Sequence, residues 1–120
     1  AVVLPVSAPF HCSLMAPAAD AMGEALERAE ITPPIVPLVA NVSAAKVTDP
    51  QAIRDLLVRQ VTGTVRWRES VEAMAAMGVD SFVELGAGKV LSGLVRRIAP
   101  DAAARSVGTP ADIEAFLASL

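Results

Sequence analysis

The residues best suited to chemistry lie in segment 4–15, which holds the only histidine of the sequence, His11. This histidine stands where an extended, proline-punctuated stretch gives way to a predicted helix. An imidazole titrates near neutral pH, so histidine is the usual general base for activating a hydroxyl or a thiol. A lone histidine in an apolar stretch is more often a packed structural residue, and the segment by itself leaves both interpretations open.

A base needs a nucleophile, and the sequence does not offer a suitable one. Cys12 follows His11 directly, but neighbouring residues of an extended segment point to opposite sides, so the two cannot easily act together. None of the serines lies in a Gly-x-Ser-x-Gly elbow, the turn that exposes a nucleophilic serine. A base without a nucleophile cannot carry out acyl transfer.

The run Gly86-Ala87-Gly88-Lys89 follows a predicted strand and at first suggests a phosphate-binding loop. That motif needs a glycine where Val83 stands and a serine or threonine where Val90 stands. The glycines are therefore interpreted as a sharp turn between a strand and a helix. Glu84 is expected to anchor this loop by accepting hydrogen bonds from backbone N–H groups.

Composition limits the classes of function. The chain has 120 residues, of which 53% are hydrophobic and 19% charged, so it is too apolar to be disordered. One cysteine excludes an internal disulfide and, with one histidine, a Cys/His zinc cluster, so no metal site is expected. The net charge of −3 and the scattered basic residues indicate no nucleic-acid partner. The helical arginines are interpreted as solvated; they are Arg54, Arg59, Arg66, Arg68, Arg96 and Arg97.

We expect no membrane partner, because no apolar run reaches the roughly 18 residues that span a bilayer. No signal peptide is evident, and we expect a cytoplasmic protein. The apolar start of the sequence looks like a strand already in progress. We therefore expect the chain to be the C-terminal part of something longer.

Apolar periodicity and turn residues predict alternating strands and helices, which is typical of an α/β fold with a mostly parallel sheet. Ser13, Asp49 and Thr109 are the expected N-caps, and Gly78 is the expected left-handed end of a helix. The predicted strands cover residues 2–7, 35–42, 81–85 and 105–107, and the predicted helices cover 14–30, 50–60, 66–77, 90–99 and 110–120.

Several ordered segments together resemble one known family. They are 6–15 (VSAPFHCSLM) followed by 17–20 (PAAD), then 36–42 (VPLVANV), 53–60 (IRDLLVRQ) with 65–67 (VRW), and 84–91 (ELGAGKVL). The first resembles the catalytic-histidine region of bacterial malonyl-CoA:acyl carrier protein transacylases, and the others match that family in order. The resemblance covers essentially the whole chain.

This resemblance implies a role for three residues. His11 would take the proton of a serine that attacks the malonyl thioester, and would later activate the phosphopantetheine thiol of the carrier protein. In the family a backbone carbonyl orients the other ring nitrogen, and the matching residue is Gln60, near a helix end where carbonyls are free. Phe10 resembles a substrate-binding residue of malonyl-selective enzymes, where a bulky ring would crowd an α-methyl branch. No cofactor is implied.

The chain departs from the family in lacking the serine elbow, the arginine that pairs with the malonyl carboxylate and the oxyanion-hole residue. By resemblance, residues 1–8 are the last strand and hinge of a ferredoxin-like subdomain. Residues 9–120 are the C-terminal part of an α/β-hydrolase-like acyltransferase subdomain. We expect the chain to be inactive alone and to supply the base to a complete transferase of fatty-acid synthesis. Its expected partners are malonyl-CoA, acyl carrier protein and the missing N-terminal part.

Two alternatives stay open. A non-catalytic module that binds acyl carrier protein would bind without acylation and would tolerate replacement of His11. A piece of a hydrolase would pass the acyl group to water and release free malonate once the missing part is present.

Overall fold

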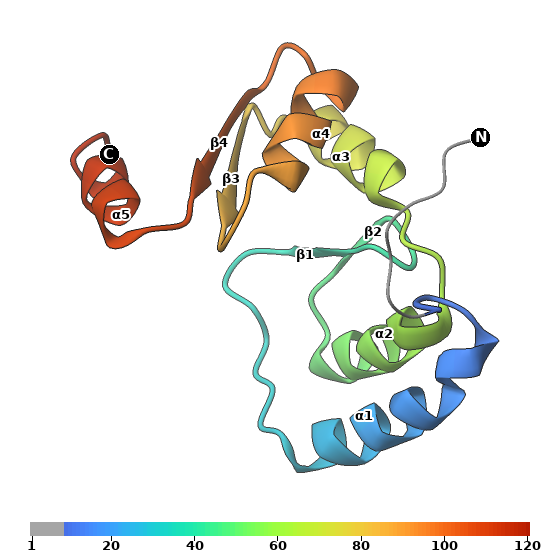
Figure 1. Cartoon of the computed structure of the whole chain (residues 1–120). Helices are drawn as coiled ribbons and strands as arrows, with labels where there is room; N and C mark the ends of the chain where they lie inside the picture. Colours follow the sequence, from blue (N-terminus) through green and yellow to red (C-terminus); the bar gives the residue numbers. More distant parts are fainter. Residues whose placement is uncertain (1–8) are drawn as a thin grey trace. The chain divides into compact units, whose positions relative to one another are not determined.

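The computed structural model describes residues 9–120, in a chain that divides into two compact units, Ala1–Ser70 and Val71–Leu120 (Figure 1). The described part combines helices with small sheets, as expected for an α/β protein. The strand expected over residues 2–7, and with it the proposed subdomain segment 1–8, lies outside the described residues.

The first helix of the chain begins later than the sequence predicts. Residues Ser13–Met15 form a short 3-10 turn, η1, and α1 (Ala16–Arg28) follows with Met15 as its N-cap and no side-chain cap. The expectation that Ser13 caps this helix is therefore wrong. Pro17 lies in the first turn of α1, where its missing N–H is not needed, and this preference places the helix start next to it.

The predicted helix after Asp49 is confirmed as α2 (Pro50–Thr62). The Asp49 carboxylate accepts a hydrogen bond of 2.7 Å from the Ala52 N–H, and Pro50 occupies the first turn. α1 and α2 pack side by side in Figure 1, and a Cβ placed on Gly23 would lie 3.9 Å from Val58 Cγ2. This helix pair forms the frame of the first unit.

The sheet of the first unit is a hairpin. β1 (Leu38–Ala40) pairs antiparallel with β2 (Ala45–Val47), with Leu38 opposite Val47. The expected strand over residues 35–42 is shorter, because Pro37 has no N–H to give to a ladder. Ala44 adopts a left-handed φ of 53° and donates to the Ala40 carbonyl at 2.7 Å, which closes the tight turn. A short turn can join only antiparallel strands, so the prediction of a mostly parallel sheet is wrong here.

The second unit contains the parallel pairing that the sequence predicts. α3 (Trp67–Ala76), which includes the boundary between the units, is followed by Gly78 at φ 90°, the expected left-handed residue. β3 (Ser81–Leu85) and β4 (Ala103–Val107) are parallel and are connected through α4 (Val90–Ile98). The last helix, α5 (Pro110–Leu117), begins at a capping box formed by Thr109 and Asp112.

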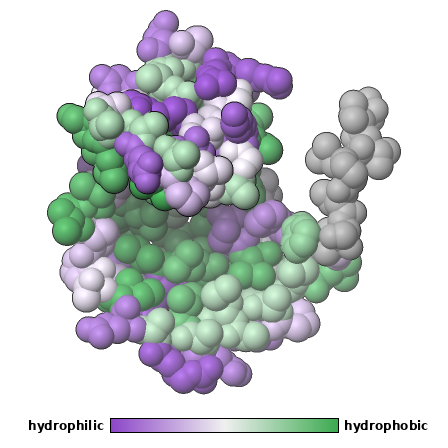
Figure 2. Space-filling model, turned by 60° about the vertical axis from the view of Figure 1, so that its left-hand side comes forward, coloured by the Kyte–Doolittle hydropathy of each residue, from purple (hydrophilic) through white to green (hydrophobic). Residues whose placement is uncertain are grey.

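Few apolar side chains of the described part are buried. They are Ile53 in the first unit and Val71, Val95 and Val107 in the second. Many others are exposed, and Figure 2 shows broad hydrophobic areas on one face. Those more than 70% exposed are Leu14, Ile35, Val36, Leu85, Val90 and Leu120. Apolar area of this extent usually packs against another part or partner.

None of the helices in the described part is both long and apolar enough to cross a membrane.

Candidate functional site

His11 lies in the loop between Pro9 and η1, and its backbone has a left-handed φ of 58°. Residues other than glycine adopt this conformation infrequently, at a cost on the order of 1 kcal/mol, and the surrounding structure has to hold them there. Such residues cluster at functional sites, so the backbone itself marks His11 for attention. The side chain is exposed.

The His11 ring is held by a main-chain group of α2, a helix that is distant from it in the sequence. Its Nδ1 lies 3.1 Å from the carbonyl oxygen of Gln60, in the last turn of α2. Carbonyls at a helix end have no partner within the helix, so this oxygen is free to accept. A carbonyl only accepts, which means that Nδ1 carries the proton in this contact. The lone pair is then on Nε2, the form in which a neutral imidazole acts as a base.

The end of α2 is shaped for this contact. The Gln60 side chain donates to the Gly63 carbonyl at 3.1 Å, and the Gly63 N–H donates to the Arg59 carbonyl at 2.9 Å. A Cβ on Gly63 would lie 2.7 Å from the Arg59 oxygen and 2.8 Å from Val42 Cγ2. Only glycine fits at this position without displacing the last turn of the helix.

The contact between His11 and Gln60 is the geometry that the resemblance implies for this pair, while the catalytic role of both residues stays a prediction. Phe10, the third predicted residue, directly precedes His11 and is 58% exposed. Its role in substrate choice also stays a prediction.

Cys12 is not arranged as a nucleophile for His11. Its thiol lies 3.1 Å from the Pro9 carbonyl oxygen and donates to it, which closes the loop around His11. Within residues 9–120, His11 has no hydrogen bond to a serine or cysteine side chain. The described residues thus hold a prepared base and no nucleophile beside it.

Arg54 corrects one interpretation of the sequence. This arginine is not a solvated side chain on a helix surface: it is half-buried and donates from Nε to the Leu26 carbonyl at 3.1 Å and from Nη2 to the Ala29 carbonyl at 2.8 Å. Sequence reasoning missed it because an arginine on a polar helix face is usually solvated, and only the packing of α1 on α2 brings the acceptors within reach.

Glu84 is the loop anchor that the sequence predicts. Its carboxylate accepts hydrogen bonds from the Ser92 N–H at 2.8 Å, the Ser92 hydroxyl at 2.7 Å and the Leu91 N–H at 3.1 Å. The Ser92 backbone N–H and then its hydroxyl hold the pKa of Glu84 below its usual range. Gly86 and Gly88, at φ 125° and 98°, form the turn into α4, and the interpretation of a structural turn is confirmed.

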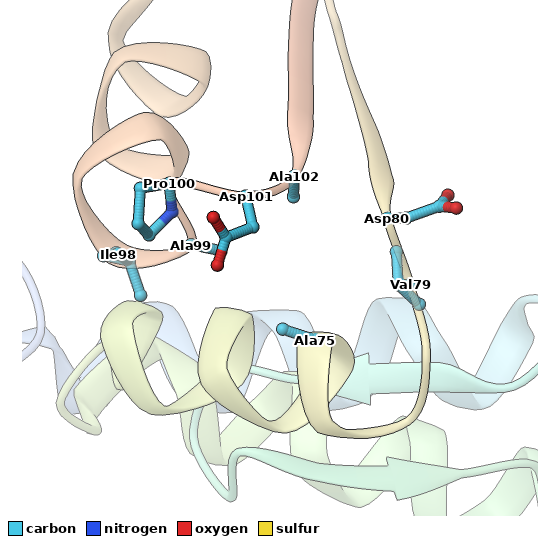
Figure 3. A pocket seen from close by; sticks show the side chains of 8 residues that line it. All are labelled: Ala75, Val79, Asp80, Ile98, Ala99, Pro100, Asp101 and Ala102. Atoms are coloured by element: carbon cyan, nitrogen blue, oxygen red, sulfur yellow. The ribbon is translucent and has the colours of Figure 1, made fainter.

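A cavity of about 350 Å³ in the second unit offers no comparable chemistry. Its lining residues are Ala75, Val79, Asp80, Ile98, Ala99, Pro100, Asp101 and Ala102, and most of them are apolar (Figure 3). The carboxylates of Asp80 and Asp101 point away from each other in Figure 3, so they do not form an acid–base pair. Over residues 9–120, no cluster of His, Cys, Asp and Glu could hold a metal ion.

Comparison with known proteins identifies relatives along nearly the whole chain. The malonyl CoA-acyl carrier protein transacylase of Salmonella typhimurium is 47% identical over 117 residues, which cover 98% of this chain and 38% of that protein. The crystal structure of acyl-carrier-protein-S-malonyltransferase from Bartonella henselae is 57% identical, with a TM-score of 0.88 over 98% of this chain and 38% of the other. No family model matches the chain.

A further solved structure, described as a type II PKS acyl-carrier protein in complex with its malonyl-transacylase, is 41% identical with a TM-score of 0.86. It covers 98% of this chain and 38% of the other. The chain thus spans well under half the length of the relatives that it matches. Sequence and fold agree along almost all of it: the chain belongs to the malonyl-CoA:acyl carrier protein transacylase family and corresponds to a C-terminal portion of its members.

Proposed function

We propose that this chain supplies the general base of a transferase that moves a malonyl group from malonyl-CoA to the phosphopantetheine thiol of acyl carrier protein. The observation that carries the proposal is the hydrogen bond between His11 Nδ1 and the Gln60 carbonyl, which leaves Nε2 free to accept a proton. The reaction belongs to fatty-acid synthesis and proceeds without a cofactor. A cytoplasmic location is part of the same proposal.

The proposed reaction has two transfers, and His11 moves a proton in each. In the first, a serine hydroxyl gives its proton to Nε2 while its oxygen attacks the thioester carbonyl, and coenzyme A leaves as a thiol with that proton. In the second, the carrier protein's thiol gives its proton to Nε2 and its sulfur attacks the malonyl-serine ester. The serine oxygen then leaves and takes the proton back, so His11 ends unchanged.

The serine lies in the part of the enzyme that this chain does not contain. The chain spans 38% of the Salmonella relative, and we place the nucleophile, the carboxylate-binding arginine and the oxyanion hole in the remainder. We assign residues 9–120 to an α/β-hydrolase-like acyltransferase subdomain and residues 1–8 to the last strand and hinge of a ferredoxin-like one. The exposed apolar side chains described above support such a partner, because a whole enzyme would cover them.

The carrier protein is the proposed acceptor. A relative 41% identical to this chain forms a complex with an acyl carrier protein, and the sequence match covers 98% of the present chain. A surface that contributes to such a complex is therefore expected within the complete enzyme.

A chimaera tests the proposal directly. This chain replaces the matching 38% of the Salmonella typhimurium transacylase, and malonyl transfer from malonyl-CoA to acyl carrier protein is measured. We expect the chimaera to be active, the chain alone to be inactive, and His11→Ala in the chimaera to lower the rate by about 10²- to 10⁴-fold. Ser13→Ala, which changes an exposed polar side chain of the same segment, is the matched control.

The other outcomes distinguish the alternatives. An active chimaera that keeps its rate after His11→Ala would contradict the proposed base. Carrier-protein binding without acylation, unchanged by His11→Ala, would favour a non-catalytic binding module. Release of free malonate in place of malonyl-carrier protein would favour a hydrolase.

A further inference from the structure

The loop that carries His11 leads through the short turn η1 into α1, so the position of α1 determines where the imidazole lies. None of the residues of α1 is fully buried, and hydrophobic packing alone therefore holds this helix weakly. Its last residue is followed by Ala29 in an extended conformation, without the left-handed glycine that commonly satisfies the carbonyls of a helix end. The Ala29 N–H donates to the Leu26 carbonyl, but at a long 3.3 Å, so the carbonyls at this helix end have room for a further donor.

Arg54 of α2 is that donor. Its guanidinium donates to the Leu26 carbonyl at 3.1 Å and to the Ala29 carbonyl at 2.8 Å, so one side chain binds the last turn of α1 and its C-cap residue. Hydrogen bonds from a charged donor are about twice as strong as neutral ones, and this side chain is partly shielded from water. The positive charge also suits the negative end of the helix dipole.

The contacts between the two helices follow one another in a regular order. Arg54 donates to Leu26 and Ala29, Val58 lies opposite Gly23, and Gln60 bonds His11. As the residue number rises along α2 it falls along α1, which means that the helices run antiparallel. Arg54 and Gln60 thus bind the segment 11–29 at its two ends.

We propose that Arg54 is a positioning residue, which fixes α1 on α2 and thereby holds the His11 ring against the Gln60 carbonyl. The left-handed backbone of His11 makes this support necessary, because a residue in that conformation keeps its geometry only where its surroundings impose it. The proposal concerns the base named under the proposed function and rests on it for its relevance to catalysis. Its test requires no enzymatic activity.

The test uses the tautomer of His11, which is the only histidine and so gives one set of ring signals in a ¹⁵N-labelled chain. Two-bond ¹⁵N–¹H correlation spectra at a pH where the ring is neutral distinguish Nδ1–H from Nε2–H. We expect Nδ1–H in the unchanged chain. In Arg54→Met we expect the ratio of Nδ1–H to Nε2–H to fall by about fivefold, the effect of losing one typical hydrogen bond.

Two control variants separate a positioning role of Arg54 from a general loss of structure. Arg59→Met removes an exposed arginine of the same helix and should leave the ratio unchanged. Arg54→Lys keeps a positive donor and should restore part of the ratio. Circular dichroism verifies that each variant is folded. If Arg54→Met does not fold, Arg54→Gln is judged by the same ratio.

A folded Arg54→Met, or Arg54→Gln in its place, with the tautomer ratio of the unchanged chain would overturn the proposal. So would an equal fall in Arg59→Met, because charge alone would then explain the effect. These results are independent of the chimaera experiment. If the chimaera's rate depends on His11 but the tautomer ratio does not change in the Arg54 variants, the role of Arg54 is refuted and the proposed function stands.

Discussion

The Nδ1 atom of His11 lies 3.1 Å from the main-chain oxygen of Gln60, which is 49 residues away in the sequence. The acceptor belongs to the backbone, so the identity of the side chain at position 60 matters less than the path of the helix end. Substitutions that change only the side chain at position 60 should therefore affect His11 less than substitutions that shift the backbone at the end of α2.

We expect Gln60→Ala in the chimaera to lower malonyl transfer by less than about tenfold, whereas His11→Ala abolishes most of it. The Gln60 side chain bonds the Gly63 carbonyl at 3.1 Å, and its loss costs roughly 1 kcal/mol of stability while the accepting carbonyl stays. Initial rates of malonyl transfer by the two variants measure this difference. Equal losses in the two would show that the side chain at position 60, and not its carbonyl, is what His11 requires.

Gly63→Ala should be more harmful than its small size suggests. The added methyl would lie 2.7 Å from the Arg59 carbonyl oxygen and 2.8 Å from Val42 Cγ2, so the last turn of α2 would have to shift. We expect a loss of about 1 to 3 kcal/mol in the free energy of unfolding, measured by urea denaturation.

Gly93→Ala is the matched control for that variant. Gly93 lies inside α4, and a Cβ there would meet nothing within 4 Å. Alanine is the better helix former, so this change should stabilise the chain by up to about 1 kcal/mol. A destabilisation of the same size in both variants would contradict the steric explanation for Gly63.

Local signals in the sequence predicted much of the fold. Asp49, Thr109 and Gly78 occupy the helix ends at which their chemistry places them, and Glu84 forms the anchor expected near the C-terminal end of a strand. Each of these features depends on residues that are close in the sequence, at most eight positions apart for Glu84 and Ser92. Local pattern is sufficient for such features because the partners are fixed by the chain itself.

The features that the sequence does not predict depend on contacts between residues distant in sequence or on a left-handed backbone conformation. The hairpin between β1 and β2 was not predicted, because Ala44 carries no sign that it adopts a left-handed conformation. The sequence pattern predicts a solvated Arg54, since its acceptors Leu26 and Ala29 come within reach only when α1 packs on α2. The contact of His11 with Gln60 was expected only through the family resemblance.

Glu84 should make the stability of the chain depend on acid pH. Hydrogen bonds from the Ser92 N–H and hydroxyl lower the pKa of Glu84 in the folded state, so the folded chain favours the carboxylate more than the unfolded chain does. The resulting stability is complete above the unfolded pKa, about 4.3, and is lost as the pH falls through the lower folded pKa.

Glu84→Gln should therefore be less stable than the unchanged chain at pH 7, and the difference should shrink as the pH falls below about 4. Urea denaturation at neutral and acid pH measures both. Glu27→Gln, an exposed glutamate of α1, is the control for the loss of charge alone. A difference that stays constant across this range would refute the assignment to the Glu84 carboxylate.

Phe10 is expected to exclude substrates with a branch next to the thioester. It directly precedes His11 and is 58% exposed in this chain, so its ring is available to contact an acyl group held beside the base. In the chimaera, Phe10→Ala should raise the ratio of kcat/KM for methylmalonyl-CoA to that for malonyl-CoA by about tenfold, the lower range of discrimination for one methyl group. Leu14→Ala, which removes another exposed apolar side chain of the same segment, should leave the ratio unchanged.

Because both substrates share the same reacting carbonyl, a general weakening of His11 lowers both rates and does not alter their ratio. An unaltered ratio in Phe10→Ala would thus assign substrate choice to the part of the enzyme outside this chain.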